Sequence, residues 1–149
     1  MKRKLSMTVN GSTVALEVDA HRTLLEVLRN DLEAYGYAFN SSTDTEVVAQ
    51  MLASAPGADW QERVTTVMRA IQGAYCLIAL TPNELIAMRD PYGVRPLCLG
   101  KLNGTGWVVA SETCALDHLG AEFVREIAPG EALVIDRRGV NAFQAVESP

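Results

Sequence analysis

Cysteine, positive charge and long apolar runs are scarce in this sequence, and each shortage excludes a class of protein. The three cysteines, Cys76, Cys98 and Cys114, are far apart and include no CxxC pair, so neither a disulfide framework nor a metal site is predicted. The formal net charge is −5 without a basic stripe, which argues against a nucleic-acid partner. Apolar runs such as residues 74–80 are too short to cross a bilayer. We therefore expect a cytoplasmic protein with no membrane or nucleic-acid partner.

What is present is typical of a globular domain. Hydrophobic residues make up 48% of the chain and charged residues 21%, and 149 residues are enough to bury one core. Residues 5–18 alternate between apolar and polar around Asn10-Gly11, a pair that tolerates positive φ, so a β-hairpin is predicted. A helix is expected next, because Thr23–Glu26 fits a capping box and an apolar stripe runs along residues 24–32.

Two further helices are predicted before the pattern changes. Thr43–Glu46 is a second capping box, and apolar positions recur through residues 47–55 at helical spacing. Asp59–Glu62 is predicted to cap the start of the next helix, whose apolar face repeats along residues 64–71. Gly73 is suited to end it.

Short strands are predicted for the remainder of the chain. They are expected at residues 74–80, 84–88, 97–99, 107–110, 123–127, 132–135 and 140–143. Because the connections are short, we expect a largely antiparallel meander. Helices that precede strands, rather than alternating with them, favour an α+β fold, here in a single compact domain over residues 1–149.

Five motifs resemble those of one family, in the same order. They are Phe39–Glu46, Gly73–Tyr75, Arg89–Leu97, Val109–Asp117 and Pro129–Glu131. Together they resemble the C-terminal part of the glutaminase domain in the amidophosphoribosyltransferase family, which opens purine biosynthesis. The resemblance implies that residues 38–148 adopt a partial N-terminal-nucleophile hydrolase fold of the type 2 glutamine amidotransferases. That fold has two stacked antiparallel sheets between helical layers.

Residues 1–37 resemble a different family. Residues 7–11, 18–19 and 23–29 are similar to the opening of the plant-type 2Fe–2S ferredoxin domain in small subunits of xanthine and carbon monoxide dehydrogenases. Such a cluster needs four cysteines, three of them at C-x4-C-x2-C spacing, and residues 35–45 contain none. We therefore interpret the chain as a chimera that holds no cofactor, and the missing cysteines make an electron-transfer fragment the less favoured alternative.

The resemblance also implies which catalytic group is required. In this family the thiolate of an N-terminal cysteine attacks the glutamine amide, and its own α-amine serves as the base. Here the sequence starts with Met1-Lys2, and none of the three cysteines carries a free α-amine. The Asn10-Gly11 pair is interpreted as a hairpin turn rather than as the family's oxyanion hole. We therefore assign no catalytic residue and expect an inactive domain.

One binding position carries over from the family. Asp44 matches the aspartate that receives the α-amino group of glutamine, so glutamine or another small amino acid is a weakly bound partner. An aspartate at a helix start also complements the helix dipole, and both interpretations stay open.

The other motif residues are expected to be structural. We expect Arg89, Asp90 and Arg95 to form ion pairs around the turn that ends at Gly93. Ser111 is expected to cap a helix, in preference to an acid–base role for Glu112 and Asp117. A metal site at Cys114 and His118 is disfavoured, because two ligands without a third are weak evidence.

Two functions therefore remain open. The first is an inactive, truncated glutamine amidotransferase-like domain, and the alternative is a non-catalytic structural or protein-interaction module. Removing the first strands of the parent fold should uncover a sheet edge. We expect the hairpin of residues 5–18 to pair with the later strands there, or two copies of the chain to form a homodimer through that edge.

Overall fold

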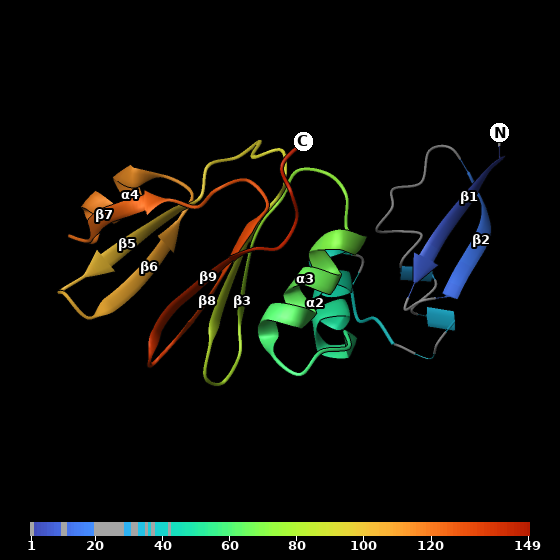
Figure 1. Ribbon diagram of the computed structural model, residues 1–149, viewed down its shortest axis with the longest axis horizontal. Coiled ribbons are helices and arrows are strands. Elements are labelled where there is room, and N and C mark those ends of the chain that lie inside the picture. The colour runs from blue at the N-terminus through green and yellow to red at the C-terminus, as the bar shows by residue number, and fades with distance from the viewer. Residues whose placement is uncertain are drawn as a thin grey trace. The chain divides into compact units, whose positions relative to one another are not determined.

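The computed structural model describes residues 2–9, 12–19, 29–30, 33–34, 36, 38–41 and 43–149. Its contacts divide the chain into two compact units, Met1–Ser54 and Ala55–Pro149, and each is described by itself (Figure 1). The expectation of one compact domain stays a prediction. The expected capping box at Thr23–Glu26 and the apolar stripe after it lie outside the described residues. Within the described ranges, no helix has the length and apolar character needed to cross a membrane.

The first unit begins with the predicted β-hairpin. Strands β1 (Lys2–Val9) and β2 (Ser12–Asp19) pair antiparallel, with Val9 opposite Ser12. The hairpin prediction is therefore confirmed. Among the described strands β1 and β2 form a two-stranded sheet of their own. The expectation that the hairpin pairs with the later strands stays a prediction.

Helix α2 (Asp44–Ser54) follows in the same unit, where the sequence predicted a helix. Val47, Val48 and Leu52 are its buried residues, at most 6% exposed. Their i, i+1, i+5 spacing places them on one face, as the apolar pattern requires.

The second unit opens with helix α3 (Trp60–Ala70), which buries Val64, Val67 and Met68. The carboxylate of Asp59 accepts a hydrogen bond from the amide of Glu62 at 2.9 Å, so the predicted N-cap is confirmed. The Glu62 carboxylate in turn accepts from the amide of Ala58 at 2.8 Å. The first bond satisfies an amide that a helix start otherwise leaves unpaired, and the second holds the residue before the N-cap.

Seven strands complete this unit in two antiparallel sheets (Figure 1). The four-stranded sheet has the order β3-β4-β8-β9, and the three-stranded sheet has the order β6-β5-β7. Their bounds are β3 (Cys76–Leu80), β4 (Leu85–Arg89), β5 (Cys98–Leu102), β6 (Gly106–Ala110), β7 (Glu122–Glu126), β8 (Glu131–Asp136) and β9 (Gly139–Gln144). The α+β class is confirmed, whereas the single meander is wrong because the chain leaves the first sheet after β4 and returns beside β4 as β8.

The main core lies between strands of both sheets. Ala87, Leu133 and Ile135 come from the four-stranded sheet, and Leu97, Leu99 and Ile127 come from β5 and segments beside it. A smaller cluster of Cys98, Leu116 and Ala121 packs under helix α4 (Thr113–His118). Strand β5 therefore buries both of its faces, Leu99 toward one core and Cys98 toward the other, as strand alternation requires.

Candidate functional site

The segment that leads into α2 is held by the side chain of Glu46. Its carboxylate accepts the amides of Asn40 and Ser41, each at 2.8 Å, and the hydroxyl of Ser41. The bond from the Asn40 amide, followed by those from Ser41, lowers the pKa of Glu46. The predicted capping box is wrong in its detail, because Glu46 reaches past Thr43 to residues farther upstream.

Arg29 holds the same segment with its guanidinium group. It donates to the backbone carbonyls of Ser41 and Thr43, the latter at 2.8 Å, and it lies 4.6 Å from the ring centroid of Phe39. Arg29 and Glu46 thus fix the entry into α2, where Asp44 is the first helical residue. The Asp44 side chain is exposed and bonds to no other described residue, so its carboxylate faces solvent at the positive end of the helix.

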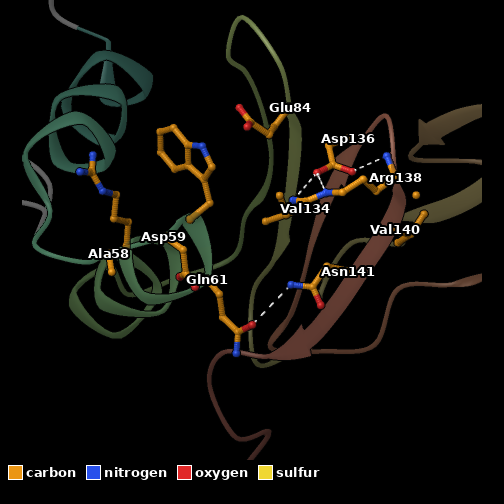
Figure 2. Close-up of a pocket in the computed structure, with 12 residues that line it drawn as sticks. Ala58, Asp59, Gln61, Glu84, Val134, Asp136, Arg138, Val140 and Asn141 are labelled. Carbon is orange, nitrogen blue, oxygen red and sulfur yellow. Dashed lines mark hydrogen bonds and ion pairs between the residues drawn. The ribbon is translucent and has the colours of Figure 1, made fainter.

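A groove of about 630 Å³ lies in the second unit beside the start of α3 (Figure 2). Two pairs of its polar side chains contact each other, since Asp136 pairs with Arg138 at 2.7 Å and the Asn141 amide donates to Gln61 at 3.4 Å. The hydrogen bond from Arg138 holds the pKa of Asp136 below its ordinary value. The lining residues are Ala58, Asp59, Trp60, Gln61, Arg63, Glu84, Val134, Asp136, Arg138, Gly139, Val140 and Asn141. Because they include no thiol, hydroxyl or imidazole, this groove has no nucleophile for amide hydrolysis.

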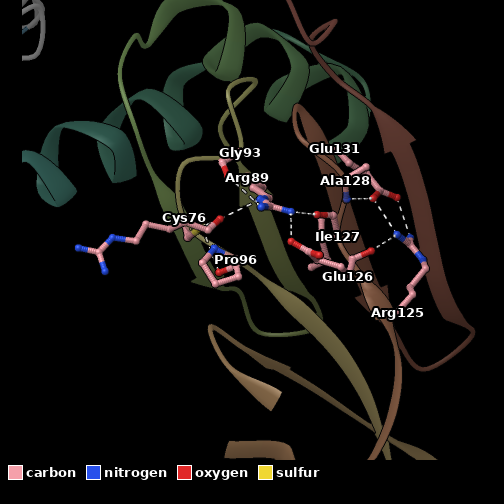
Figure 3. Close-up of polar contacts among 10 residues, drawn as sticks. Cys76, Arg89, Gly93, Pro96, Arg125, Glu126, Ile127, Ala128 and Glu131 are labelled. Atoms are coloured by element: carbon pink, nitrogen blue, oxygen red, sulfur yellow. Dashed lines mark hydrogen bonds and ion pairs between the residues drawn. The ribbon is translucent and has the colours of Figure 1, made fainter. Parts of the chain in front are cut away.

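Arg89 is the centre of a polar cluster in the second unit (Figure 3). It ends β4, is only 5% exposed, and donates to the backbone carbonyls of Arg95 at 2.9 Å, Gly93 at 3.1 Å and Ile127. Its ion-pair partner is Glu126, at 2.8 Å. The predicted ion pairs among Arg89, Asp90 and Arg95 are therefore wrong, since Arg95 contributes its carbonyl and its side chain is exposed.

Asp90 is fully buried and organises the turn after β4. Its carboxylate accepts the amides of Tyr92 at 2.9 Å and Tyr75 at 3.2 Å, and its backbone carbonyl accepts the amides of Gly93 and Gly130. Gly93 has a φ of +61°, and a Cβ there would lie 2.7 Å from Pro129. These contacts support the predicted structural role of Arg89, Asp90 and Gly93.

The structure adds a pair that sequence reasoning missed. Arg125 donates two hydrogen bonds to Glu131, at 2.7 and 2.8 Å, and the amide of Ala128 donates to the same carboxylate at 2.7 Å. Burial opposes ionisation of Glu131, yet the bonds from Arg125 and Ala128 prevail and hold its pKa below the ordinary value of 4.5. The sequence signal was the Pro129–Glu131 motif, in which a carboxylate directly follows a tight turn.

This pair predicts an acid-dependent loss of stability. Because the pKa of Glu131 is lowered in the folded state, its stabilising contribution is present above pH 4.5 and disappears as the pH falls through the folded pKa. We expect Glu131→Gln to unfold at a lower urea concentration than wild type at pH 7. The difference between the two urea midpoints should narrow below pH 4.5. Urea titrations across pH 3–7 measure this, and a gap that stays constant with pH would contradict it.

Helix α4 begins in a different way from the one that the sequence predicted. The helix has Glu112 as its N-cap residue with no side-chain capping bond, so the predicted cap at Ser111 is wrong. The thiol of Cys114 donates to the Glu112 carboxylate at 3.2 Å, while Asp117 and His118 are exposed. In the part of the chain that the structure describes, no three potential metal ligands come together.

None of the three cysteines is placed as an attacking thiolate. Burial raises the pKa of Cys76 and Cys98, and the hydrogen bond to Glu112 raises that of Cys114. All three thiols therefore stay protonated at neutral pH, where a nucleophilic cysteine needs a lowered pKa.

Comparison with known proteins identifies one domain type. A family described as "Glutamine amidotransferase domain" matches residues 6–118. Amidophosphoribosyltransferase 2 of Arabidopsis thaliana, a chloroplastic protein, is 45% identical over 113 residues, which are 76% of this chain and 20% of that protein. The amidophosphoribosyltransferase of Bacillus subtilis is 35% identical over 133 residues, 89% of this chain and 28% of that protein.

The fold is also similar to solved structures of this enzyme. One is the glutamine phosphoribosylpyrophosphate amidotransferase from B. subtilis in complex with ADP and GMP, with a TM-score of 0.76 and 34% identity. That similarity covers 97% of this chain and 32% of the other. The chain therefore spans about a fifth to a third of the length of these relatives.

Proposed function

Because the chain belongs to the glutamine amidotransferase domain family, we propose that it binds glutamine weakly and does not hydrolyse it. The family match over residues 6–118 and the amidophosphoribosyltransferase relatives relate it to an enzyme of purine biosynthesis. Since the chain spans only a part of those relatives, the proposal concerns the glutamine-binding part of the domain alone.

The observation that carries the binding proposal is the position of Asp44. Its carboxylate is exposed at the first residue of α2, and the segment before it is fixed by Arg29 and Glu46. A carboxylate held in this way offers a partner to the α-ammonium group of an amino acid. Because an exposed ion pair contributes little free energy, we expect a Kd of roughly millimolar or weaker.

The proposed lack of hydrolysis rests on the cysteines. Attack on the glutamine amide needs a thiolate with an adjacent base, and the environments of Cys76, Cys98 and Cys114 all favour the neutral thiol. Each of these cysteines also lies within the chain, so none has the free α-amine that the family uses as its base. Bound glutamine is therefore expected to remain intact.

Titration with L-glutamine, followed by amide NMR, tests the binding proposal. We expect saturable shifts of the Thr43, Asp44 and Thr45 amides. We expect Asp44→Asn to raise the Kd for glutamine at least fivefold. Asp117→Asn, which removes an exposed carboxylate at α4, is the matched control and should bind like wild type. Glutaramate, which lacks the α-amino group, should produce no such shifts, and equal shifts with both ligands would contradict the role of Asp44.

The alternative is a non-catalytic structural or protein-interaction module. It is favoured by the hydrogen bonds of the motif side chains, because Arg89, Asp90 and Glu131 bond to other groups of the same domain. Absence of any glutamine-dependent shift at 50 mM, well above a Kd of roughly millimolar, would select this alternative.

Three finer points belong to the same proposal. A ferredoxin-like origin of residues 1–37 remains a hypothesis, and the family match gives it no support because it begins at residue 6, inside β1. A cytoplasmic location remains part of the proposal, as does pairing of two copies through a sheet edge.

A further inference from the structure

Helices α2 and α3 begin with similar acidic residues but use them differently. At α3 the aspartate is the residue before the helix, and the carboxylate of Asp59 accepts the amide of Glu62 at 2.9 Å. At α2 the aspartate is the first helical residue, and no described group donates a hydrogen bond to the carboxylate of Asp44. Because a capping side chain comes from the residue before the helix, Asp44 lies one residue too late to cap α2, and its carboxylate stays available.

The segment before α2 is instead held by two side chains of opposite charge. Its N–H groups bond to Glu46, whose carboxylate accepts the amides of Asn40 and Ser41, each at 2.8 Å. Its C=O groups bond to Arg29, whose guanidinium donates to the carbonyls of Ser41 and Thr43, the latter at 2.8 Å. Donors and acceptors of the same backbone are thus fixed from two sides, and we call Arg29 and Glu46 the entry clamp.

Both members of the entry clamp are themselves held in place. The guanidinium of Arg29 lies 4.6 Å from the ring centroid of Phe39, and it bonds to the two carbonyls through separate nitrogens. Stacking on a ring fixes the plane of a guanidinium, which allows both bonds to form at once. The bond from the Asn40 amide and, as a smaller effect, the charge of Arg29 lower the pKa of Glu46, so its carboxylate is ionised at neutral pH.

We propose that Arg29 and Glu46 are positioning residues of the glutamine site, an inference that rests on the proposed function. They hold the backbone that carries Asp44, and each acts on the ligand through the Asp44 carboxylate. When the binding-competent conformation is only partly populated, the apparent Kd rises in inverse proportion to its population. A released segment that is competent about a fifth of the time therefore binds glutamine about fivefold more weakly.

The opposite charges of the entry clamp separate positioning from a direct effect of charge. Removing the negative charge of Glu46 makes the surroundings of Asp44 more positive, which by Coulomb's law alone weakens the attraction for an ammonium group. Removing the positive charge of Arg29 makes the same surroundings more negative, which alone strengthens that attraction. Positioning predicts weaker binding in both cases, so the direction of the change at Arg29 distinguishes the two explanations.

Titration of the full chain with L-glutamine, followed by amide NMR, measures the Kd of each variant. Glu46→Gln and Arg29→Met should each raise the Kd about fivefold. Arg29→Lys should have an intermediate Kd, because an ammonium group keeps the charge but lacks the planar fork that reaches both carbonyls. Glu62→Gln is the matched control and should bind like wild type, since Glu62 is also the third residue of its helix and accepts the amide of Ala58 at 2.8 Å.

A double substitution tests whether the entry clamp acts through Asp44. In the Asp44→Asn background, Glu46→Gln should change the Kd by less than about twofold, because the group that it positions is already lost. Wild-type affinity in Glu46→Gln, or wild-type or tighter affinity in Arg29→Met, would overturn the inference and leave glutamine binding intact. A wild type with no glutamine-dependent shift at about 50 mM would overturn the binding proposal and this inference with it.

Discussion

Replacing Arg89 with methionine is expected to lower the free energy of unfolding by about 3–5 kcal/mol. The substitution keeps the apolar stem but leaves the carbonyls of Gly93, Arg95 and Ile127 without their donor. It also leaves Glu126 without its ion-pair partner. Buried acceptors without a donor lose their hydration with nothing to replace it, which is why the cost exceeds that of an ordinary surface ion pair.

Urea denaturation monitored by tryptophan fluorescence measures this effect, because Trp107 packs against the core between the sheets. Arg89→Lys should be destabilised to an intermediate degree, since an ammonium group cannot reach three carbonyls and a carboxylate in the geometry of a guanidinium. Arg95→Met, at an exposed side chain in the same motif, should change stability little. Equal stabilities of Arg89→Met and Arg95→Met would contradict the assignment.

Gly130→Ala is expected to lower the free energy of unfolding by about 3–5 kcal/mol, from backbone strain and steric overlap together. Gly130 has a φ of +73°, and a Cβ there would lie 2.1 Å from the carbonyl oxygen of Val146 and 2.8 Å from Nε2 of Gln144. The amide of Gly130 also donates to Asp90, and its carbonyl accepts from Ala145 and Val146. The backbone therefore cannot move away without breaking the turn.

Gly104→Ala provides the matched comparison. Gly104 has a φ of +75°, nearly that of Gly130, but no atom lies within 4 Å of an added Cβ. Its cost should be limited to the strain of the left-handed conformation, about 1–2 kcal/mol. The difference between the free energies of unfolding of the two variants gives the cost of the steric overlap. Similar losses of stability in both variants would show that the contact with Val146 relaxes freely.

The elements of the fold were predictable from local patterns, whereas their partners were not. Asn10-Gly11 predicted the hairpin, and the spacing of Val64, Val67 and Met68 predicted α3, because turn chemistry and periodicity act over a few residues. The pairing of β8 with β4 joins strands that lie far apart in the sequence. Periodicity detects the strands but carries no information about that pairing.

The polar sites show the same division. The sequence placed Asp44 at a helix start and Asp59 as an N-cap, and the structure has both there. It assigned Arg89 to its neighbours Asp90 and Arg95, whereas the acid that pairs with it is Glu126, on β7. That pairing arises only when β7 adds to β5, so no local motif identifies it.

We propose that this domain binds glutamine without hydrolysing it. Ammonia release from 20 mM L-glutamine by the 149-residue chain at about 100 µM, measured with an enzyme-coupled assay, is the decisive measurement. We predict release at the rate of the protein-free control for wild type, Asp44→Asn and a variant with all three cysteines replaced by serine. Release that rises in proportion to protein concentration and disappears in Asp44→Asn would contradict the claim.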